Sequence, residues 1–134
     1  MKPFDWPVRI YYEDTDAGGV VYHANYIKYF ERARTEWLRQ VGYSQARLAR
    51  DEGLLFSVVE LDTVFRRPAR LDDELVVRSA VGLSGRASVL FTHEARLGTA
   101  EGELIASGRV KVACIDAASF RPRRLPDWLL ERLD

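Results

Sequence analysis

Residues 24–41 read ANYIKYFERARTEWLRQV, and this stretch decides how the rest of the chain has to fold. Its apolar side chains recur at spacings of three and four residues: Tyr26, Phe30, Ala33, Trp37 and Val41. That period is typical of an α-helix with one buried face, and Gly42 follows as a stop signal. Further apolar side chains lie between these positions, so we expect a helix that protein covers on several sides.

The second half of the chain changes to the period of two that is typical of β-strands. Apolar and polar side chains alternate in residues 75–83, 89–97 and 104–114, and less cleanly in residues 55–65. Residues 75–83, 89–97 and 104–114 are connected at Ser84-Gly85 and at residues 98–102, and both connections have the length of hairpin turns. These segments are therefore expected to be antiparallel neighbours.

Shorter elements complete the expected order. Residues 8–12 predict one more strand, residues 44–51 predict a short helix that ends before Gly53, and Pro126 opens a terminal helix. The long helix is then the one element able to cover the apolar face of a five-stranded antiparallel sheet. We therefore predict the α+β class.

Size and composition place the chain among ordinary globular proteins. It has 134 residues and a mass of 15.3 kDa, with 47% apolar and 30% charged residues, so we expect one domain over residues 1–134. Twenty basic residues balance 20 acidic ones, which argues against a nucleic-acid-binding protein and against one that lies on an anionic membrane. No stretch resembles a signal peptide or a transmembrane segment, and we expect a cytoplasmic protein.

Composition also excludes several kinds of site. Cys114 is the only cysteine, which rules out an intrachain disulfide and a cysteine-rich zinc site. His23 and His93 are the only histidines, so a three-histidine metal site is impossible, and their spacing gives no sign that they converge. We expect neither a metal nor a cofactor, and we expect His93 and Cys114 to be core residues.

Candidate catalytic residues gather just before the long helix, in residues 11–26, which read YYEDTDAGGVVYHANY. This segment contains Tyr12, Asp16 and His23 together with two further acids, Glu13 and Asp14. Three carboxylates so close in sequence can raise one another's pKa values, which suits a base near neutral pH. A solvated acidic turn that caps the helix has the same composition, and the residues alone leave that alternative open.

Two features favour a ligand site over an acidic turn. Gly18-Gly19 allows the backbone to approach a ligand closely. The helix begins near His23-Ala24 without Ser, Thr, Asp or Asn at the expected cap, although Asn25 is close by. Its first N–H groups are therefore expected to be available to an anion or a developing oxyanion, as in a hydrolase centre.

The same residues carry a resemblance to a known family. Residues 13–26, EDTDAGGVVYHANY, followed by residues 29–36, YFERARTE, closely resemble the Tol-Pal-associated acyl-CoA thioesterases, the YbgC-like group of the hotdog-fold 4-hydroxybenzoyl-CoA thioesterase family. Residues 68–73 and 86–88 fit the same group. The resemblance implies a hotdog fold, in which the sheet wraps the helix and active sites lie where two subunits pair.

The resemblance also assigns roles to individual residues. It implies that Asp16 is the catalytic carboxylate, that the N–H of His23 polarises the thioester carbonyl, and that the Tyr12 and His23 side chains take part. The 4-hydroxybenzoyl enzymes carry Tyr-Pro where this chain has His23-Ala24, so a short- or medium-chain acyl-CoA is the expected substrate. Asp16 as nucleophile and Asp16 as general base both remain open.

Further expectations concern binding and assembly. Arg86 and Ser88 resemble family positions that meet the CoA nucleotide, and the acyl donor is either CoA or acyl carrier protein. The wide apolar stripe of the helix and the edges of the sheet predict a homodimer or homotetramer.

Two other functions are alternatives to thioester hydrolysis. One is a non-catalytic acyl-binding partner of a cell-envelope complex, against which the joint presence of Asp16 and His23 argues. The other is a hotdog hydratase or dehydratase acting on a thioester, which the motif of residues 14–21, DTDAGGVV, disfavours.

Overall fold

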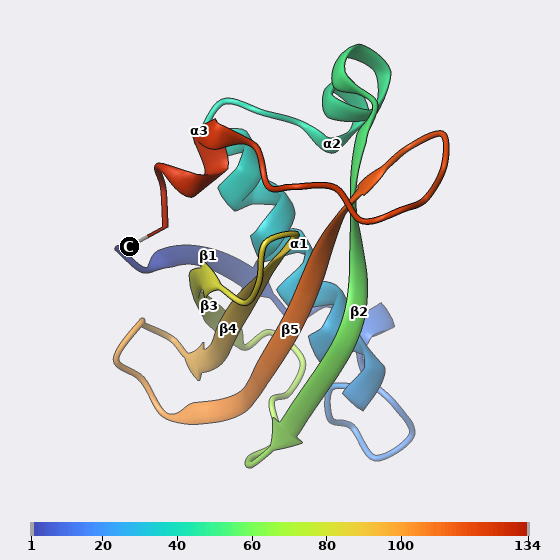
Figure 1. Ribbon diagram of the computed structural model, residues 1–134. Coiled ribbons are helices and arrows are strands. Elements are labelled where there is room, and N and C mark those ends of the chain that lie inside the picture. Colours follow the sequence, from blue (N-terminus) through green and yellow to red (C-terminus); the bar gives the residue numbers. More distant parts are fainter. Residues whose placement is uncertain (1, 134) are drawn as a thin grey trace.

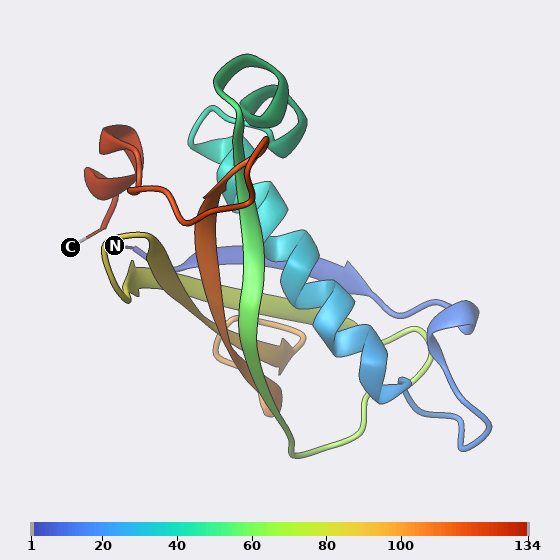
Figure 2. The same cartoon turned by 45° about the vertical axis from the view of Figure 1, so that its right-hand side comes forward.

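The computed structural model describes residues 2–133, in which five antiparallel strands form one sheet around a long helix (Figure 1). The strands are β1 (Phe4–Arg9), β2 (Leu54–Phe65), β3 (Glu74–Leu83), β4 (Ser88–Leu97) and β5 (Leu104–Asp116). The helix is α1 (His23–Gln40), and the strands lie in the order β1-β3-β4-β5-β2. Figure 2 shows the sheet curving around α1. This arrangement confirms the predicted α+β class.

The helix predicted over residues 24–41 is confirmed as α1, displaced by one residue. Its side chains that face the sheet are almost fully buried, with Tyr29 at 1% and Phe30 at 0% exposure. Just after the helix Gly42 takes a φ of +104°, a conformation that glycine adopts without steric cost and that ends the helix.

Side chains of α1 divide the core into two clusters along the helix axis. Tyr26 and Phe30, from the first half, pack in one cluster with Leu75 at the start of β3. Trp37, from the second half, packs in the other cluster with Val89 at the start of β4. Because β3 and β4 are antiparallel, their starts lie at opposite ends of the sheet. The two ends of α1 therefore also lie at opposite ends of the sheet.

The first strand was predicted too late in the chain. Residues 8–12 were expected to form it, but β1 covers Phe4–Arg9 and Tyr12 belongs to a short 3₁₀ turn, η1 (Tyr12–Asp14). Pro7 caused the error, because proline usually interrupts a strand. Here β1 is an edge strand that pairs only with β3, and an edge strand tolerates a residue without an N–H group.

The shorter helices lie where the sequence indicated. Residues 44–51 were predicted to be helical, and they contain α2 (Gln45–Arg47) and most of a π-helical turn, η2 (Leu48–Glu52). Ser44 caps α2 by accepting a hydrogen bond from the Arg47 N–H at 3.3 Å. Gly53 follows η2 with a φ of +62°. The terminal helix α3 (Asp127–Leu130) begins directly after Pro126.

The second edge of the sheet is the long strand β2, which pairs only with β5. A bulge between Val58 and Glu60 interrupts its register. Large apolar side chains on this strand remain 43–52% exposed: Val58, Val59, Leu61, Val64 and Phe65. The free edge of β2 is thus unusually apolar for a strand that faces solvent.

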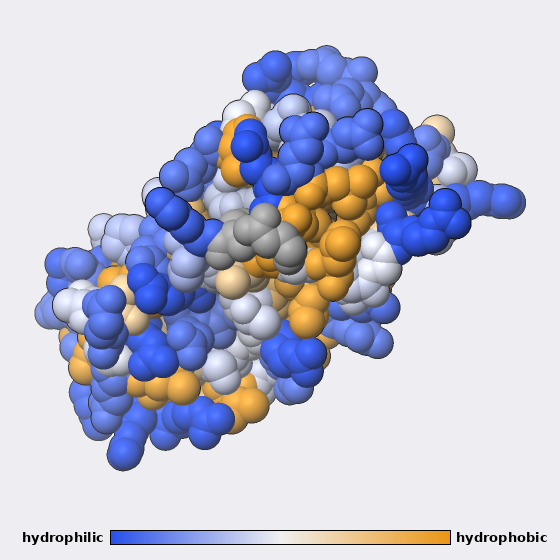
Figure 3. Space-filling model, turned by 60° about the vertical axis from the view of Figure 1, so that its left-hand side comes forward, coloured by the Kyte–Doolittle hydropathy of each residue, from blue (hydrophilic) through white to orange (hydrophobic). Residues whose placement is uncertain are grey.

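Both ends of the described chain lie on one face of the molecule, near the start of β1 and the end of α3 (Figure 2). Figure 3 shows apolar side chains gathered among charged ones on this side. Phe4, Val41 and Leu130 are partly buried there against the second core cluster. Among residues 2–133 no helix is long and apolar enough to cross a membrane.

Gly108 of β5 is predicted to be essential for the packing of α1. A Cβ atom at this position would lie 2.7 Å from Cε2 of Phe30, whose ring is fully buried. We expect Gly108→Ala to lower the free energy of unfolding by about 1–3 kcal/mol, the usual cost of overpacking a core. Urea unfolding followed by circular dichroism measures this.

The matched control is Gly82→Ala in β3, where an added Cβ meets nothing within 4 Å. This variant should be as stable as the wild type or slightly more stable. Equal stability of Gly108→Ala and Gly82→Ala would show that the approach of Phe30 does not limit the packing.

Candidate active site

The loop between η1 and α1 folds back on itself. Thr15 and Val21 form an isolated antiparallel bridge, and the Asp16 N–H donates to the Val20 carbonyl at 2.9 Å. At the tip Gly19 takes a φ of +78°, and its N–H donates to the Asp16 carbonyl at 3.0 Å. Residues 15–21 therefore form a closed turn, which we call the acidic loop, and it delivers the chain to the start of α1 (Figure 1).

Asp16 lies at the tip of the acidic loop with its carboxylate exposed. Its Oδ1 atom accepts a hydrogen bond from the Gly18 N–H at 2.8 Å. A Cβ atom at position 18 would lie 3.2 Å from this oxygen, so glycine leaves room for the carboxylate. The turn fixes the direction of the Asp16 side chain and leaves Oδ2 without a partner in the part of the chain described.

The start of α1 has no side-chain cap, as the sequence indicated. The Asn25 amide, which was close to the expected cap position, instead donates from Nδ2 to the Asp14 carbonyl at 2.8 Å and fastens the helix to the loop. The Tyr22 N–H donates to the same carbonyl at 2.9 Å. Within residues 2–133 the N–H groups of His23 and Ala24 have no hydrogen-bond partner. Unpaired N–H groups at the positive end of a helix dipole are able to bind an anion.

The His23 side chain lies at the surface beside two aromatic rings. Its ring centroid is 4.6 Å from that of Tyr22 and 5.9 Å from that of Phe65, the last residue of β2. The Phe65 ring also packs on Tyr26, with 5.8 Å between the two ring centroids. Sequence reasoning missed Phe65, and its only local signal is its place as the last apolar residue of a strand, next to Arg66. The end of β2 thus forms an apolar wall beside His23.

The connection between β2 and β3 supports the acidic loop from the other side. The Val21 N–H donates to the Ala69 carbonyl at 2.8 Å, and Val20 and Arg70 form an isolated bridge. These contacts join residues 68–73, which carried part of the resemblance, to the loop that contains Asp16. Arg70 is thereby placed next to the acidic loop, with its side chain exposed.

Other sequence candidates lie in the same region without touching Asp16. Tyr12 is 82% exposed, and its hydroxyl makes no hydrogen bond to any residue that the structure describes. The Asp14 carboxylate accepts from the Tyr11 N–H at 2.7 Å and so closes its own turn. The three acids therefore do not form a hydrogen-bonded cluster. Between residues 2 and 133 no three His, Cys, Asp or Glu side chains are arranged to hold a metal ion.

Tyr29 of α1, whose place in the helix stripe predicted a core residue, is almost fully buried. Burial, and then the negative charge of Asp14, hold the pKa of the Tyr29 hydroxyl well above its usual range. The hydroxyl is buried and has no hydrogen-bond partner of standard geometry among the described residues. Tyr29 is therefore a buried, protonated hydroxyl close enough to Asp14 in η1 to feel its charge.

Arg86 and Ser88 are not brought to the acidic loop within one chain. Arg86 is exposed in the turn between β3 and β4, where its carbonyl accepts from the Leu125 N–H at 3.1 Å. This turn belongs to the end of the sheet that holds the second half of α1, whereas Asp16 lies at the other end. Ser88 is only 9% exposed.

The prediction that His93 and Cys114 are core residues is confirmed, at 1% and 0% exposure. Burial raises the pKa of the Cys114 thiol. Desolvation, and then the charge of Arg34, lower the pKa of His93 to about 3. Arg34 Nη1 lies 3.1 Å from His93 Nε2, and Ser79 Oγ lies 2.7 Å from Nδ1.

Comparison with known proteins gives consistent results. Residues 10–133 match the family model of the thioesterase-like superfamily. The chain is 46% identical to the acyl-CoA thioester hydrolase YbgC of Escherichia coli O157:H7, over 92% of this chain and 90% of that protein. It is 43% identical to the acyl-CoA thioesterase YbgC of Haemophilus influenzae, over 92% of this chain and 88% of that one. The crystal structure of a DHNA-CoA thioesterase from Staphylococcus aureus superposes with a TM-score of 0.87 at 26% identity, covering 98% of this chain and 89% of that chain.

His93 should make the stability of the protein depend on pH. Its pKa is about 3 in the folded chain against 6.5 for a free side chain, so between these values only the unfolded state takes up the proton. Stability is therefore retained above pH 6.5 and lost as the pH falls, by about 2 kcal/mol at pH 5. His93→Gln removes this loss, and urea unfolding at pH 7 and pH 5 measures it.

The matched control for this measurement is His23→Gln, which removes a histidine whose side chain lies in solvent. The difference in unfolding free energy between wild type and His93→Gln should shrink from pH 7 to pH 5. A difference that is the same at both pH values would mean that His93 is not held neutral.

Proposed function

Since the chain belongs to the thioesterase-like superfamily, in the hotdog-fold group of YbgC acyl-CoA thioesterases, we propose that the acidic loop and the start of α1 are its catalytic centre. The protein is an acyl-CoA thioester hydrolase. We propose that residues 1–134 form a single thioesterase domain.

One observation carries the proposal: an exposed carboxylate lies on the loop that leads directly into a helix start whose N–H groups are unpaired in the described structure. Hydrogen bonds from the Tyr22 N–H and the Asn25 amide to the Asp14 carbonyl join the chain just before Asp16 to the first turn of the helix. Hydrolysis of a thioester needs a polarised carbonyl and an oxygen nucleophile delivered to its carbon. The N–H groups of His23 and Ala24 supply the first by stabilising the oxyanion, and Asp16 supplies the second.

Two routes use Asp16, and both need its negative charge. As a general base, Asp16 takes a proton from water while the water oxygen bonds to the carbonyl carbon, and the C–S bond then breaks to release the CoA thiolate. As a nucleophile, a carboxylate oxygen bonds to that carbon directly, the thiolate leaves, and water hydrolyses the resulting mixed anhydride. The His23 ring then protonates the thiolate or positions water, and Tyr12 orients either group.

A short- or medium-chain acyl group suits the surroundings of the loop. The exposed ring of Phe65, which packs on Tyr26, gives the acyl chain an apolar surface next to His23. His23-Ala24 stands where the 4-hydroxybenzoyl enzymes have Tyr-Pro, which separates this substrate from theirs. The two YbgC relatives are named for acyl-CoA, and we propose the same thioester class here, with acyl carrier protein as the alternative donor.

We further propose that a second copy of the chain completes the site. The edge of β2 has unpaired N–H and C=O groups, and Val58, Leu61 and Phe65 are exposed on its side nearest α1. Pairing of two β2 edges about a two-fold axis covers these side chains and leaves His23 at the boundary between copies. A homodimer built this way is the unit from which a homotetramer would form.

In this assembly Arg86 is the proposed contact for the phosphates of the CoA nucleotide. Antiparallel pairing of two β2 edges places the Arg86 end of one sheet at the Asp16 end of the other. Ser88, the second proposed contact for the nucleotide, is only 9% exposed, and its Oγ would lie 3.0 Å from a Cβ at Gly85. It packs under the turn that presents Arg86.

Asp16→Asn is the direct test of the catalytic role. The amide keeps the shape of the side chain but neither accepts a proton from water nor attacks a carbonyl, so kcat should fall about 10²–10⁴-fold with little change in KM. His23→Ala should be milder, because its backbone N–H remains. Steady-state release of free thiol from a series of acyl-CoAs measures both.

Glu13→Gln serves as the matched control, since it removes an exposed carboxylate from the same segment. Its activity should stay close to that of the wild type, and thermal melting confirms that each variant is folded. A folded Asp16→Asn that keeps more than about a tenth of the wild-type kcat would exclude Asp16 as the catalytic carboxylate.

The oligomer has its own test. Light scattering at micromolar concentration should give at least twice the chain mass of 15.3 kDa. Leu61→Glu puts a charge on the proposed interface and should give monomers with much reduced activity. Leu83→Glu, which replaces an exposed leucine away from β2, should leave the mass of the oligomer unchanged. A wild-type protein of single-chain mass would contradict the shared site.

A further inference from the structure

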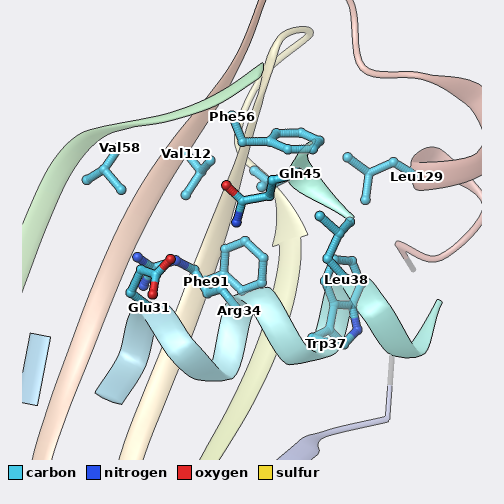
Figure 4. A pocket seen from close by; sticks show the side chains of 11 residues that line it. Glu31, Arg34, Trp37, Leu38, Gln45, Phe56, Val58, Phe91, Val112 and Leu129 are labelled. Carbon is cyan, nitrogen blue, oxygen red and sulfur yellow. The ribbon is translucent and has the colours of Figure 1, made fainter. Parts of the chain in front are cut away.

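A cavity lies between the second half of α1 and the sheet, separate from the acidic loop. Its volume is 140 Å³. Figure 4 shows the side chains that surround it, among them Trp37, Phe56, Phe91, Glu31 and Arg34. Arg34 is eleven residues beyond His23, which is about 16 Å along a helix with a rise of 1.5 Å per residue. No step of the proposed hydrolysis uses this cavity.

The guanidinium of Arg34 is held at the cavity by a buried histidine. Arginine only donates hydrogen bonds, so Nε2 of His93 must be the acceptor in the 3.1 Å contact with Arg34 Nη1. The ring is therefore neutral, with its proton on Nδ1, where it donates to Ser79 Oγ at 2.7 Å. Stacking on Phe30 at 4.9 Å and on Phe91 at 5.8 Å fixes the ring plane.

Arg34 has no acidic partner among residues 2–133. No carboxylate oxygen in that range lies within 4.0 Å of its guanidinium nitrogens, and its one hydrogen bond goes to the neutral ring of His93. The guanidinium carbon lies 6.0 Å from the Phe91 ring centroid, and burial lowers the pKa of Arg34, an effect that the charge of Glu31 partly offsets. A partly buried cation with four unused N–H donors calls for an anion, because burial without a counter-charge is costly.

We propose that this cavity binds a small apolar monocarboxylate, with its carboxylate on Arg34 and its hydrocarbon part among Trp37, Phe56 and Phe91. Guanidinium and carboxylate form paired hydrogen bonds of matching geometry. A dry cavity of about 150 Å³ holds a benzene-sized molecule, so this one suits an acid of the size of benzoate or a short fatty acid. The inference goes beyond the proposed hydrolysis, although acids of this class are what such a reaction releases.

Glu31 provides a test of the negative charge of the proposed ligand. Its carboxylate lies at the rim, where Oε1 accepts from Thr35 Oγ1 at 3.0 Å and Thr35 in turn accepts from Gln45 Nε2 at 3.0 Å. This chain of hydrogen bonds holds Glu31 beside the cavity but beyond ion-pair distance of Arg34. A bound carboxylate is attracted by Arg34 and repelled by Glu31, so neutralising the two residues should have opposite effects on binding.

The experiment titrates sodium benzoate into the full-length protein and follows the NMR signal of the Trp37 indole N–H, assigned with Trp37→Phe. We expect a saturable shift with benzoate and binding at least about tenfold weaker for benzamide, which has nearly the same shape but no charge. Arg34→Gln should weaken benzoate binding at least about tenfold, Arg34→Lys less, and Glu31→Gln should strengthen it.

His23→Ala is the control for binding at the acidic loop, and it should leave the benzoate affinity unchanged. Thermal melting and light scattering accompany each variant. Equal binding of benzamide, or an affinity that responds to His23→Ala and not to Arg34→Gln, overturns the proposal. A wild type that binds no benzoate overturns it as well. If Arg34→Gln and Glu31→Gln then both give monomers, Arg34 pairs with Glu31 of a second copy instead. None of these readouts depends on thiol release.

Discussion

A single helix has to cover the inner face of a five-stranded sheet in this protein. The helix meets this demand with large aromatic side chains, Tyr26, Tyr29, Phe30 and Trp37, which reach far enough to fill the space under a curved sheet. The close approach that results is accommodated on the sheet by Gly108, opposite Phe30. The position of the helix is therefore fixed by its own aromatic side chains and by the shape of the sheet. The segments attached to its two ends are held in place as a result.

The start of the helix benefits most from this rigidity. An uncapped helix end in a small protein usually frays, but here the amide of Asn25 ties the first turn to the preceding loop. The positive end of the helix is thus kept open to a ligand without loss of order. The loop that bears Asp16 is held by backbone hydrogen bonds to Val20 and Ala69 as well, so that its carboxylate is positioned by main-chain geometry.

Local patterns predicted most of the fold, because helix and strand periods are properties of short segments. The long helix and the strands β2 to β5 follow from them, whereas the edge position that makes Pro7 acceptable in β1 depends on the whole sheet. For the site, a contiguous motif sufficed to single out Asp16 and His23. The contact between Phe65 and His23 joins residues that are 42 positions apart in the chain, and the contact between Arg34 and His93 joins residues that are 59 positions apart. No local pattern encodes such pairings. The burial of Ser88 was hidden for the same reason.

The single cysteine has a practical consequence for experiments on this enzyme. Cys114 is fully buried and burial disfavours its thiolate, so in the folded protein it is slow to react with disulfide reagents. Colorimetric detection of released thiol can therefore proceed with little background from the protein itself. Once the chain opens, the same sulfur becomes reactive, and its rate of labelling measures how often the strand β5 and its neighbours come apart.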